Sequence, residues 1–209
     1  MHARTGILAF ALAAVAGPLE AQAWDTPSFF APRAHDDVGA YIIKPESGDV
    51  GVIAMWRQSG NINLGVRGGI GGDSDGRIIL LGAELYGPLP LTTTGLPLLL
   101  AWNTGIGAGF DGVTNLRIPL GVSVGVELGQ GTGVSFLPYV HPRATFDLSA
   151  FERANGEEET ETEFNFEIDI GADIQLGERW LLRAGASLAE SEVFGVGLAY
   201  RIPRPVAVR

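Results

Sequence analysis

The chain has 209 residues, a formal net charge of −10 and no cysteine. Nucleic-acid binding needs a basic surface, so an acidic chain with a single lysine, Lys44, is predicted to have no nucleic-acid partner. Without cysteine, disulfides and thiolate metal or redox chemistry are excluded. Thirty glycines without a collagen period are typical of tight turns and of strands whose backbones lie close together.

Residues 1–23 predict a secretory signal peptide. A weakly basic start precedes the apolar stretch Gly6–Ala16, and Ala21–Ala23 match a small-x-small cleavage site. The apolar stretch is too short to cross a bilayer as a helix. We therefore expect cleavage near Ala23, then an irregular, proline-containing segment over Trp24–Asp36 and a single domain after it.

Beyond this segment, apolar residues alternate with polar or small ones in about ten runs, separated by turn residues. The predicted strands are Asp37–Lys44, Val50–Gln58, Asn61–Ile70, Arg77–Tyr86, Pro97–Phe110, Asn115–Leu128, Val134–Leu148, Glu163–Leu176, Trp180–Leu188 and Val193–Ile202. Short connections favour an antiparallel meander. Because an open meander exposes two edges, we predict a closed all-β barrel over residues 37–202, of about ten strands or alternatively eight, with a tail over 203–209.

The alternation is most regular in Asn115–Leu128 and Glu163–Leu176, where every second residue is apolar. Only a two-residue repeat separates side chains in this way, so both segments are predicted as strands with one apolar and one polar face. About thirteen residues at about 3.3 Å each, tilted near 45°, span roughly 30 Å. That length matches the hydrocarbon thickness of a bilayer.

The pattern alone leaves open which face of the barrel points outward. A soluble, lipocalin-like barrel encloses its apolar face and an apolar ligand, whereas a transmembrane barrel turns that face to lipid. Glycines such as Gly107, Gly121 and Gly195 occupy much of the other face, where a wetted surface usually carries long polar side chains. The crowded lumen of a small barrel accommodates glycine, so this composition favours the transmembrane barrel.

Aromatic residues near the strand ends favour the same interpretation, because membrane barrels carry aromatic belts at both interfaces. If the chain starts on the periplasmic side, the two belts hold Trp56, Tyr86, Trp180 and Tyr200, and Phe110, Phe146, Phe164 and Phe194, respectively. Trp102 lies inside its strand and fits neither belt. The acidic stretch Ser149–Thr162 is expected as a long outward-facing loop.

The last predicted strand carries Gly197-Leu198-Ala199-Tyr200-Arg201-Ile202. This ending is similar to the Gly-x-x-Φ-x-Φ signal by which outer-membrane barrels are recognised for insertion. The chain thus resembles small bacterial outer-membrane β-barrels of the OmpA/OmpX type, although residues 203–209 extend beyond the ending. The resemblance implies outer-membrane lipid as surroundings and the barrel-insertion machinery as a partner through Gly197–Ile202.

The face opposite the apolar one carries charged and polar residues of both signs. They are Arg67, Glu84, Asn103, Arg117, Glu127, Tyr139, His141, Arg143, Asp147, Glu167, Asp169, Asp173, Arg183 and Arg201. A barrel of eight to ten strands is narrow enough for side chains to fill. Buried charges persist when paired, so we predict an internal salt-bridge network, with a narrow polar conduit for small solutes as the functional alternative.

His141 is the basis of one catalytic hypothesis, since some outer-membrane lipid hydrolases place a serine nucleophile beside a histidine on a strand. Here Pro142 and Arg143 follow it, and Ser135 is distant along the strand. A nucleophile must lie within hydrogen-bond reach of its base. We therefore predict a lumen histidine held by a carboxylate and no catalytic residue, and keep a hydrolase using His141 as an alternative.

The segment Gly72–Gly76 resembles a fragment of a calcium loop, but it lacks the later bidentate glutamate and is also common hairpin chemistry. We predict a turn there, no metal site and no cofactor. The acidic run Glu157–Glu163 is predicted as a solvated loop tip. The expected role is non-enzymatic, either structural at the cell surface or as a narrow conduit. The pattern does not predict an oligomeric state.

Overall fold

The computed structural model describes residues 26–33, 35–45, 49–60, 62–72, 77–90, 97–110, 114–129, 133–152, 158–188 and 192–203. The strands are β1 (Asp37–Pro45), β2 (Gly51–Gln58), β3 (Asn63–Gly72), β4 (Arg77–Pro88), β5 (Leu98–Phe110), β6 (Thr114–Val126), β7 (Val134–Glu152), β8 (Glu158–Leu176), β9 (Trp180–Leu188) and β10 (Val193–Arg201). Apart from the β7–β8 hairpin, these bounds agree with the predicted ones to within two residues.

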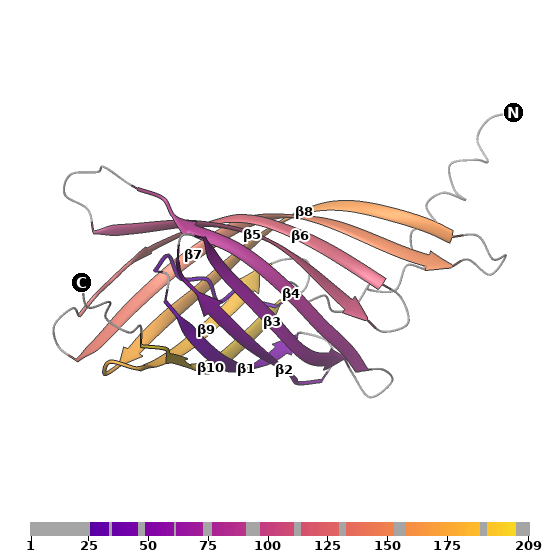
Figure 1. Ribbon diagram of the computed structural model, residues 1–209. Coiled ribbons are helices and arrows are strands. Elements are labelled where there is room, and N and C mark those ends of the chain that lie inside the picture. Colours follow the sequence, from indigo (N-terminus) through magenta and orange to yellow (C-terminus); the bar gives the residue numbers. More distant parts are fainter. Residues whose placement is uncertain are drawn as a thin grey trace, which may run out of the picture.

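The ten strands form one closed antiparallel barrel, in which β1 pairs with both β2 and β10 (Figure 1). Every other strand pairs with its neighbours along the chain, so the barrel is an up-and-down meander. The predicted all-β barrel is confirmed, with ten strands and not eight. β1 begins and β10 ends at the same rim, where Asp37 lies opposite Arg201. We call this the terminal rim, and the end where β7 turns into β8 the opposite rim.

The prediction of a loop over Ser149–Thr162 is wrong. β7 continues to Glu152 and β8 begins at Glu158, with the two strands paired throughout. β6 pairs with β7 only as far as Ala150, so the hairpin continues past the barrel wall as a two-stranded ribbon (Figure 1). Antiparallel hydrogen bonds need no apolar face. Residues 161–163 are accordingly paired although all three are exposed.

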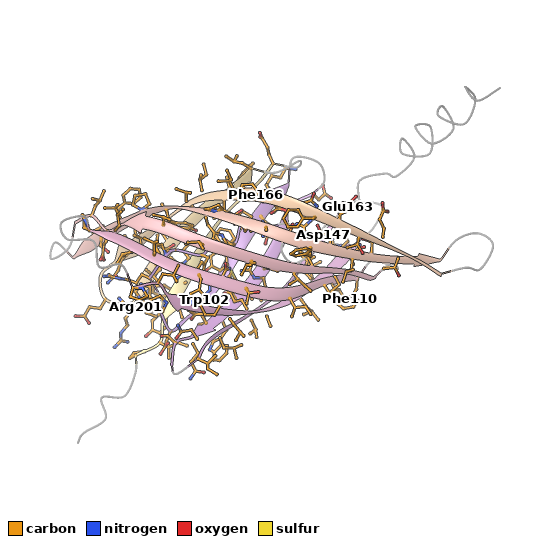
Figure 2. All side chains as sticks on the ribbon, turned by 90° about the horizontal axis from the view of Figure 1, so that it is seen from above. Trp102, Phe110, Asp147, Glu163, Phe166 and Arg201 are labelled. Carbon is orange, nitrogen blue, oxygen red and sulfur yellow. The ribbon has the colours of Figure 1, made fainter. Side chains whose placement is uncertain are left out.

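The outer face of the barrel is apolar, as the transmembrane interpretation predicts. On β8, Phe166 is 64% exposed, whereas the adjacent Glu167 is 4% exposed. On β6, Val122 is exposed beside the buried Ser123. Exposed aliphatic and aromatic side chains recur on all ten strands. Figure 2 shows side chains projecting outward from the barrel, Phe166 among them. The soluble alternative, with its apolar face enclosed, does not fit this arrangement.

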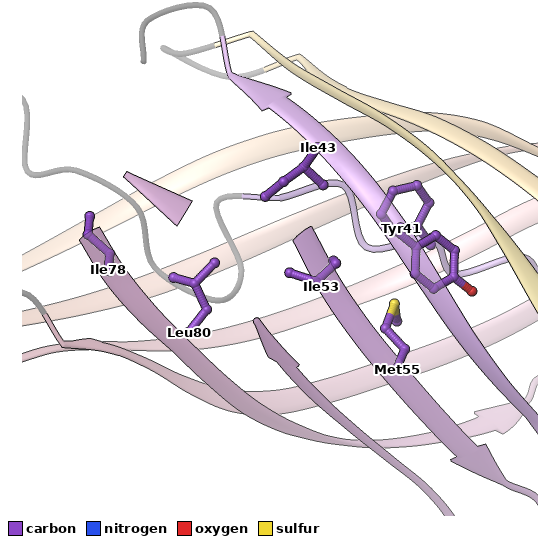
Figure 3. Packing of buried hydrophobic residues seen from close by; sticks show 7 residues of the cluster. Tyr41, Ile43, Ile53, Met55, Ile78 and Leu80 are labelled. Atoms are coloured by element: carbon purple, nitrogen blue, oxygen red, sulfur yellow. The ribbon is translucent and has the colours of Figure 1, made fainter. Parts of the chain in front are cut away.

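The interior is divided into an apolar and a charged part. The inner face of β1, β2 and β4 carries the apolar side chains Tyr41, Ile43, Ile53, Met55, Ile78 and Leu80, which Figure 3 shows together. The inner face of β6 to β9 carries most of the buried charges. The expectation that apolar residues face only outward therefore fails on β1, β2 and β4. Both faces of β2 are apolar, because Val52, Ala54 and Trp56 lie on its outer side.

Inner glycines make room for large inner side chains. Gly171 on β8 pairs with Tyr139 on β7, and a Cβ at this glycine would collide with the tyrosine ring. Gly121 on β6 has the same relation to the imidazole of His141. The glycine-rich inner face thus reflects close approach of the backbone to neighbouring side chains, which a side chain at these positions would block.

Candidate functional site

The candidate site is the barrel interior, which holds a stretch of chain that precedes β1. We call residues Thr26–Arg33 the luminal segment. Ser28 and Phe29 are fully buried, and Thr26, Phe30 and Ala31 are nearly so. No residue of the luminal segment belongs to a strand. The barrel wall therefore closes around this stretch without using it as a wall element.

Side chains from several strands hold the backbone of the luminal segment. Arg57 of β2 donates to the carbonyl oxygens of Phe29 (2.7 Å) and Ser28 (3.0 Å), and Arg67 of β3 donates to the same Ser28 oxygen at 3.0 Å. Ser123 of β6 donates to the Phe30 carbonyl at 2.7 Å. These contacts satisfy buried carbonyls that no strand neighbour could reach.

Residues of β7 and β8 hold the luminal segment from the other side of the lumen. The Ser28 amide donates to Asp169 Oδ2 at 3.0 Å, and Arg143 reaches the Thr26 carbonyl at 3.5 Å. At the terminal rim, Arg33 forms an ion pair with Glu127. The luminal segment is thus bound from several sides of the barrel, both near its middle and at the rim.

Phe29 and Phe30 occupy separate apolar pockets. Phe29 stacks on Tyr41, with ring centroids 4.6 Å apart, inside the cluster shown in Figure 3. Phe30 packs edge-on against Tyr86, with ring centroids 5.6 Å apart, and lies 5.6 Å from the Arg57 guanidinium carbon. Phe29 has φ of 48°, the only positive φ of a non-glycine residue among the described positions. This left-handed conformation is strained, and the contacts on both sides hold it.

Buried ion pairs fill the space around the luminal segment. On β2 to β4, Glu84 lies 2.6 Å from Arg57 Nε and 3.2 Å from Arg67 Nη2. On β6 to β8, Arg117 contacts Asp147 at 2.5 Å and Glu167 at 2.9 Å.

The remaining inner charges extend this arrangement from β7 round to β1. Arg143 contacts Glu167 at 2.5 Å and Asp169 at 3.4 Å. Arg183 of β9 contacts Asp37 of β1 at 2.7 Å and Asp173 of β8 at 2.9 Å. Opposite charges thus lie side by side around much of the barrel interior, which is the condition under which buried charges are tolerated.

His141 is fully buried and lies beside Ser28, a serine that no pattern in the sequence indicates. Ser28 Oγ is 2.8 Å from Nδ1 of His141, and Asp169 Oδ2 is 3.2 Å from the same nitrogen. Nε2 lies 2.9 Å from Asn103 Oδ1. In a catalytic triad, the serine and the carboxylate contact opposite ring nitrogens. Here both contact Nδ1, so the residue types of a triad are present without its geometry.

Most residues assigned to the inner face are buried inside the barrel. Those already placed in ion pairs or around His141 are Arg67, Glu84, Asn103, Arg117, Glu127, His141, Arg143, Asp147, Glu167, Asp169, Asp173 and Arg183. Tyr139 is buried beside Ala31 and Leu137. Arg201 is only half-buried at the terminal rim, apart from the central clusters.

Arg57 and Asp37 are inner-face residues that the sequence analysis missed. Both are buried and paired with residues that it included, Glu84 and Arg183. The two faces of β2 are similarly apolar, so no contrast between them indicated that Arg57 points inward. Ser28 lies in an irregular stretch, where no periodicity in the sequence indicates which way a side chain points.

Seven of the eight residues assigned to the aromatic belts lie on the outer face, and one does not. Trp56, Phe110, Phe146, Phe164, Trp180, Phe194 and Tyr200 are exposed or half-exposed. The assignment of Tyr86 is wrong: it is 3% exposed and packs inward on Phe30. Tyr86 lies two residues after the buried Glu84, and this parity turns it inward. Trp102 lies toward the terminal rim, like Arg201, whereas Phe110 lies toward the opposite rim (Figure 2).

The terminal rim carries a second titratable histidine, His35, just before β1. Burial and the nearby positive charges of Arg201 and Arg183 lower the pKa of His35 to about 3. The adjacent Asp36 accepts hydrogen bonds from the Ser59 amide and hydroxyl, each at 2.6 Å. This fixes the chain at the point where the luminal segment leads into β1.

A shallow groove of about 680 Å³ lies on the barrel wall from β1 to β6. Its lining is almost wholly apolar and includes Trp56, Val66, Leu81 and Ile106, with small residues such as Ala83 between them. The groove continues the exposed apolar face.

Several predictions fall on residues outside those described. These are the signal peptide and its cleavage site, the calcium-like residues 73–76 and the tail from residue 204. Among the described residues, no group of three or more potential metal-ligating side chains comes together. No helix in that part of the chain is long and apolar enough to cross a membrane.

No family model and no curated protein matches the chain. Solved structures do match it. The β domain of the Bordetella autotransporter Brka is 12% identical, over 81% of this chain and 100% of that one, with a TM-score of 0.48. The N-terminal β-barrel domain of Pseudomonas aeruginosa OprF is 12% identical over the same shares, with a TM-score of 0.39. Neisserial surface protein A is 12% identical over 79% and 95%, with a TM-score of 0.36.

The chain has the architecture of a small outer-membrane β-barrel. It is closed, antiparallel and even in strand number, and its outer face is apolar on every strand. The predicted resemblance to that class is therefore confirmed.

Proposed function

We propose that this protein spans the bacterial outer membrane as a closed, non-enzymatic barrel with a structural or surface role. The observation that supports this most directly is the luminal segment, buried in the lumen and surrounded by paired charges. An interior of eight strands is already filled by side chains, and ten strands leave further room. The luminal segment occupies that room, so the resting barrel offers no continuous path for solutes.

Planar bilayers test the closed state. The purified, refolded full-length chain is added to a bilayer, and the current is recorded at voltages of both signs. We expect no regular ion steps. Discrete, reproducible steps from the unmodified chain would overturn the closed barrel and support the conduit alternative.

Outer-membrane residence is tested by fractionation of a Gram-negative host that expresses the chain. We expect it in the outer-membrane fraction and resistant to extraction at alkaline pH, because its apolar face needs lipid. Recovery from the soluble periplasm would contradict the proposal. Tyr200 lies on the outer side of β10, and the exposed Ile202 directly follows this strand. We propose that the insertion machinery recognises Gly197–Ile202.

A non-enzymatic role is supported by the geometry at His141. Ser28 is fully buried and shares one imidazole nitrogen with Asp169. We expect no cleavage of phospholipid or peptide substrates by the purified chain. Hydrolysis that Ser28→Ala or His141→Ala abolishes would favour the hydrolase alternative instead.

A further inference from the structure

We propose that the lumen is a peptide-binding site, and that the luminal segment Thr26–Arg33 is a displaceable occupant whose departure opens the barrel. This inference rests on the proposed closed barrel and adds to it. It assigns the interior a ligand class: a short peptide with two adjacent aromatic residues.

The contacts of the luminal segment resemble those by which proteins bind a peptide in trans. Arg57, Arg67 and Ser123 donate to its backbone carbonyls, and Asp169 accepts one of its amides. Hydrogen bonds to backbone groups give affinity that does not depend on the peptide's side chains, and side-chain pockets give selectivity. The pockets here receive Phe29 and Phe30.

The barrel wall is complete without the luminal segment. β1 pairs with β10 along nine residues, from Asp37 to Pro45, and all ten strands close the ring. The luminal segment makes no ladder with any strand. Its removal therefore breaks no strand pairing, and the barrel has the means to stay closed as a sheet while its lumen empties.

If the luminal segment leaves, the barrel interior needs other hydrogen-bond acceptors in place of the Ser28 and Phe29 carbonyl groups. Without them, the buried guanidinium groups of Arg57 and Arg67 lose acceptors, which costs free energy unless water or another acceptor enters. Part of this cost is offset, because Phe29 is released from its left-handed φ of 48°. Another peptide carries the same backbone acceptors, so it is the occupant that this site fits.

The luminal segment is attached to the wall at β1, just after the rim contacts of Arg33 and Asp36. If the signal peptide is cleaved near Ala23, as the sequence predicts, its other end has no covalent link. A segment that is attached at one end only can leave the lumen and return. The attachment keeps its effective concentration near the site high, which favours the bound state.

The test compares two double variants of the full-length chain in planar bilayers. Phe29→Ala with Phe30→Ala empties both pockets. Phe146→Ala with Phe164→Ala is the matched control, because it removes the same side chains from an outer-face pair whose ring centroids lie 5.0 Å apart. We expect ion steps from the first variant and none from the second or from the unmodified chain.

A synthetic peptide of the sequence of residues 26–33 is then added to the conducting variant. We expect it to reduce the open probability at least about tenfold, whereas a peptide with both phenylalanines replaced by alanine has no effect. Equal block by both peptides, or block by neither, would overturn the proposed peptide site.

A variant lacking residues 24–34 provides a second route if the double variant fails to fold. Its barrel is checked by circular dichroism before recording. Conduction by the unmodified chain would overturn the closed barrel itself. A silent unmodified chain together with silent, folded pocket and deletion variants would overturn only the displaceable occupant.

Discussion

At the scale of single residues, the interior depends on charges that are tolerated only as groups. Arg57 illustrates this, because one side chain pairs with Glu84 and also donates to the carbonyls of Ser28 and Phe29. A buried ion pair adds little net stability compared with an apolar replacement. Removal of one partner is nevertheless costly, because the other charge is left buried without compensation. The interior is therefore sensitive to single changes more than to paired ones.

Replacement of Arg57 by Met should destabilise the barrel by roughly 3–5 kcal/mol, because Glu84 then keeps only part of its compensation. Urea unfolding of the barrel in lipid vesicles measures the free energy of unfolding. The double variant Arg57→Met with Glu84→Gln should lose less unfolding free energy than the sum of the two single variants, because no uncompensated carboxylate is left in the interior. The exposed Arg77 provides the matched control, with an expected change below about 0.5 kcal/mol for Arg77→Met. An additive double variant would contradict the coupling.

His35 gives the terminal rim a pH dependence whose sign follows from its pKa. The folded-state pKa is about 3, below the unfolded value near 6.5, so the folded chain binds the proton less readily than the unfolded chain. Stability contributed by neutral His35 is present above pH 6.5 and declines as the pH falls toward 3. We expect the urea midpoint of the unmodified chain to fall more between pH 7 and 4 than that of His35→Gln. Parallel pH profiles would contradict this.

At the scale of elements, the sequence predicted strands well where one face is apolar and the other is not. β8 is such a strand, and its direction follows from Phe166 and Glu167 alone. β2 is not, because Ile53 and Met55 are as apolar as Val52 and Ala54, so its inward residues, including Arg57, could not be assigned by contrast. Tyr86 lies two residues after Glu84, so the alternation of the strand indicated that both side chains point inward. Its position at the strand end nevertheless led to its assignment to an outer aromatic belt.

The luminal segment is the element that the sequence could not place. Its contacts are remote along the chain: Ser28 and His141 are 113 positions apart. An irregular stretch has no repeat that reports a direction, so neither its burial nor the serine beside His141 followed from a pattern. The inner ion pairs were accessible as residue types on one face, but their partners depended on the register between strands.

The β7–β8 ribbon beyond the barrel wall should be dispensable for folding. Residues 161–163 are exposed, and β7 has no β6 partner after Ala150. A variant in which a two-residue Asn-Gly turn replaces residues 151–159 keeps Ala150 opposite Thr160. It should therefore unfold within about 1 kcal/mol of the unmodified chain, as surface changes usually do. Urea unfolding in vesicles measures this. A loss of several kcal/mol would show that the ribbon supports the barrel.

At the scale of the whole molecule, the barrel is organised by which face of each strand points outward and which points into the lumen. Apolar side chains cover the outside of all ten strands, while paired charges, inner glycines and the luminal segment fill the inside. In water this exterior would be costly, at about 25 cal/mol for each Å² of exposed apolar area. In lipid the same face is compatible with its surroundings, and within the closed ring each strand pairs with a neighbour on both sides.

The chain has no cysteine, so single cysteines can report which face points outward by nitroxide labelling in bilayers. Val122→Cys and Ser123→Cys are neighbours on β6, and Thr145→Cys and Phe146→Cys are neighbours on β7; in each pair one side chain is buried and the other lies outside. The measurement is relaxation of the label by oxygen dissolved in the lipid. The transmembrane barrel predicts strong relaxation at 122 and 146 and weak relaxation at 123 and 145. The reverse pattern, or equal relaxation within both pairs, would contradict it.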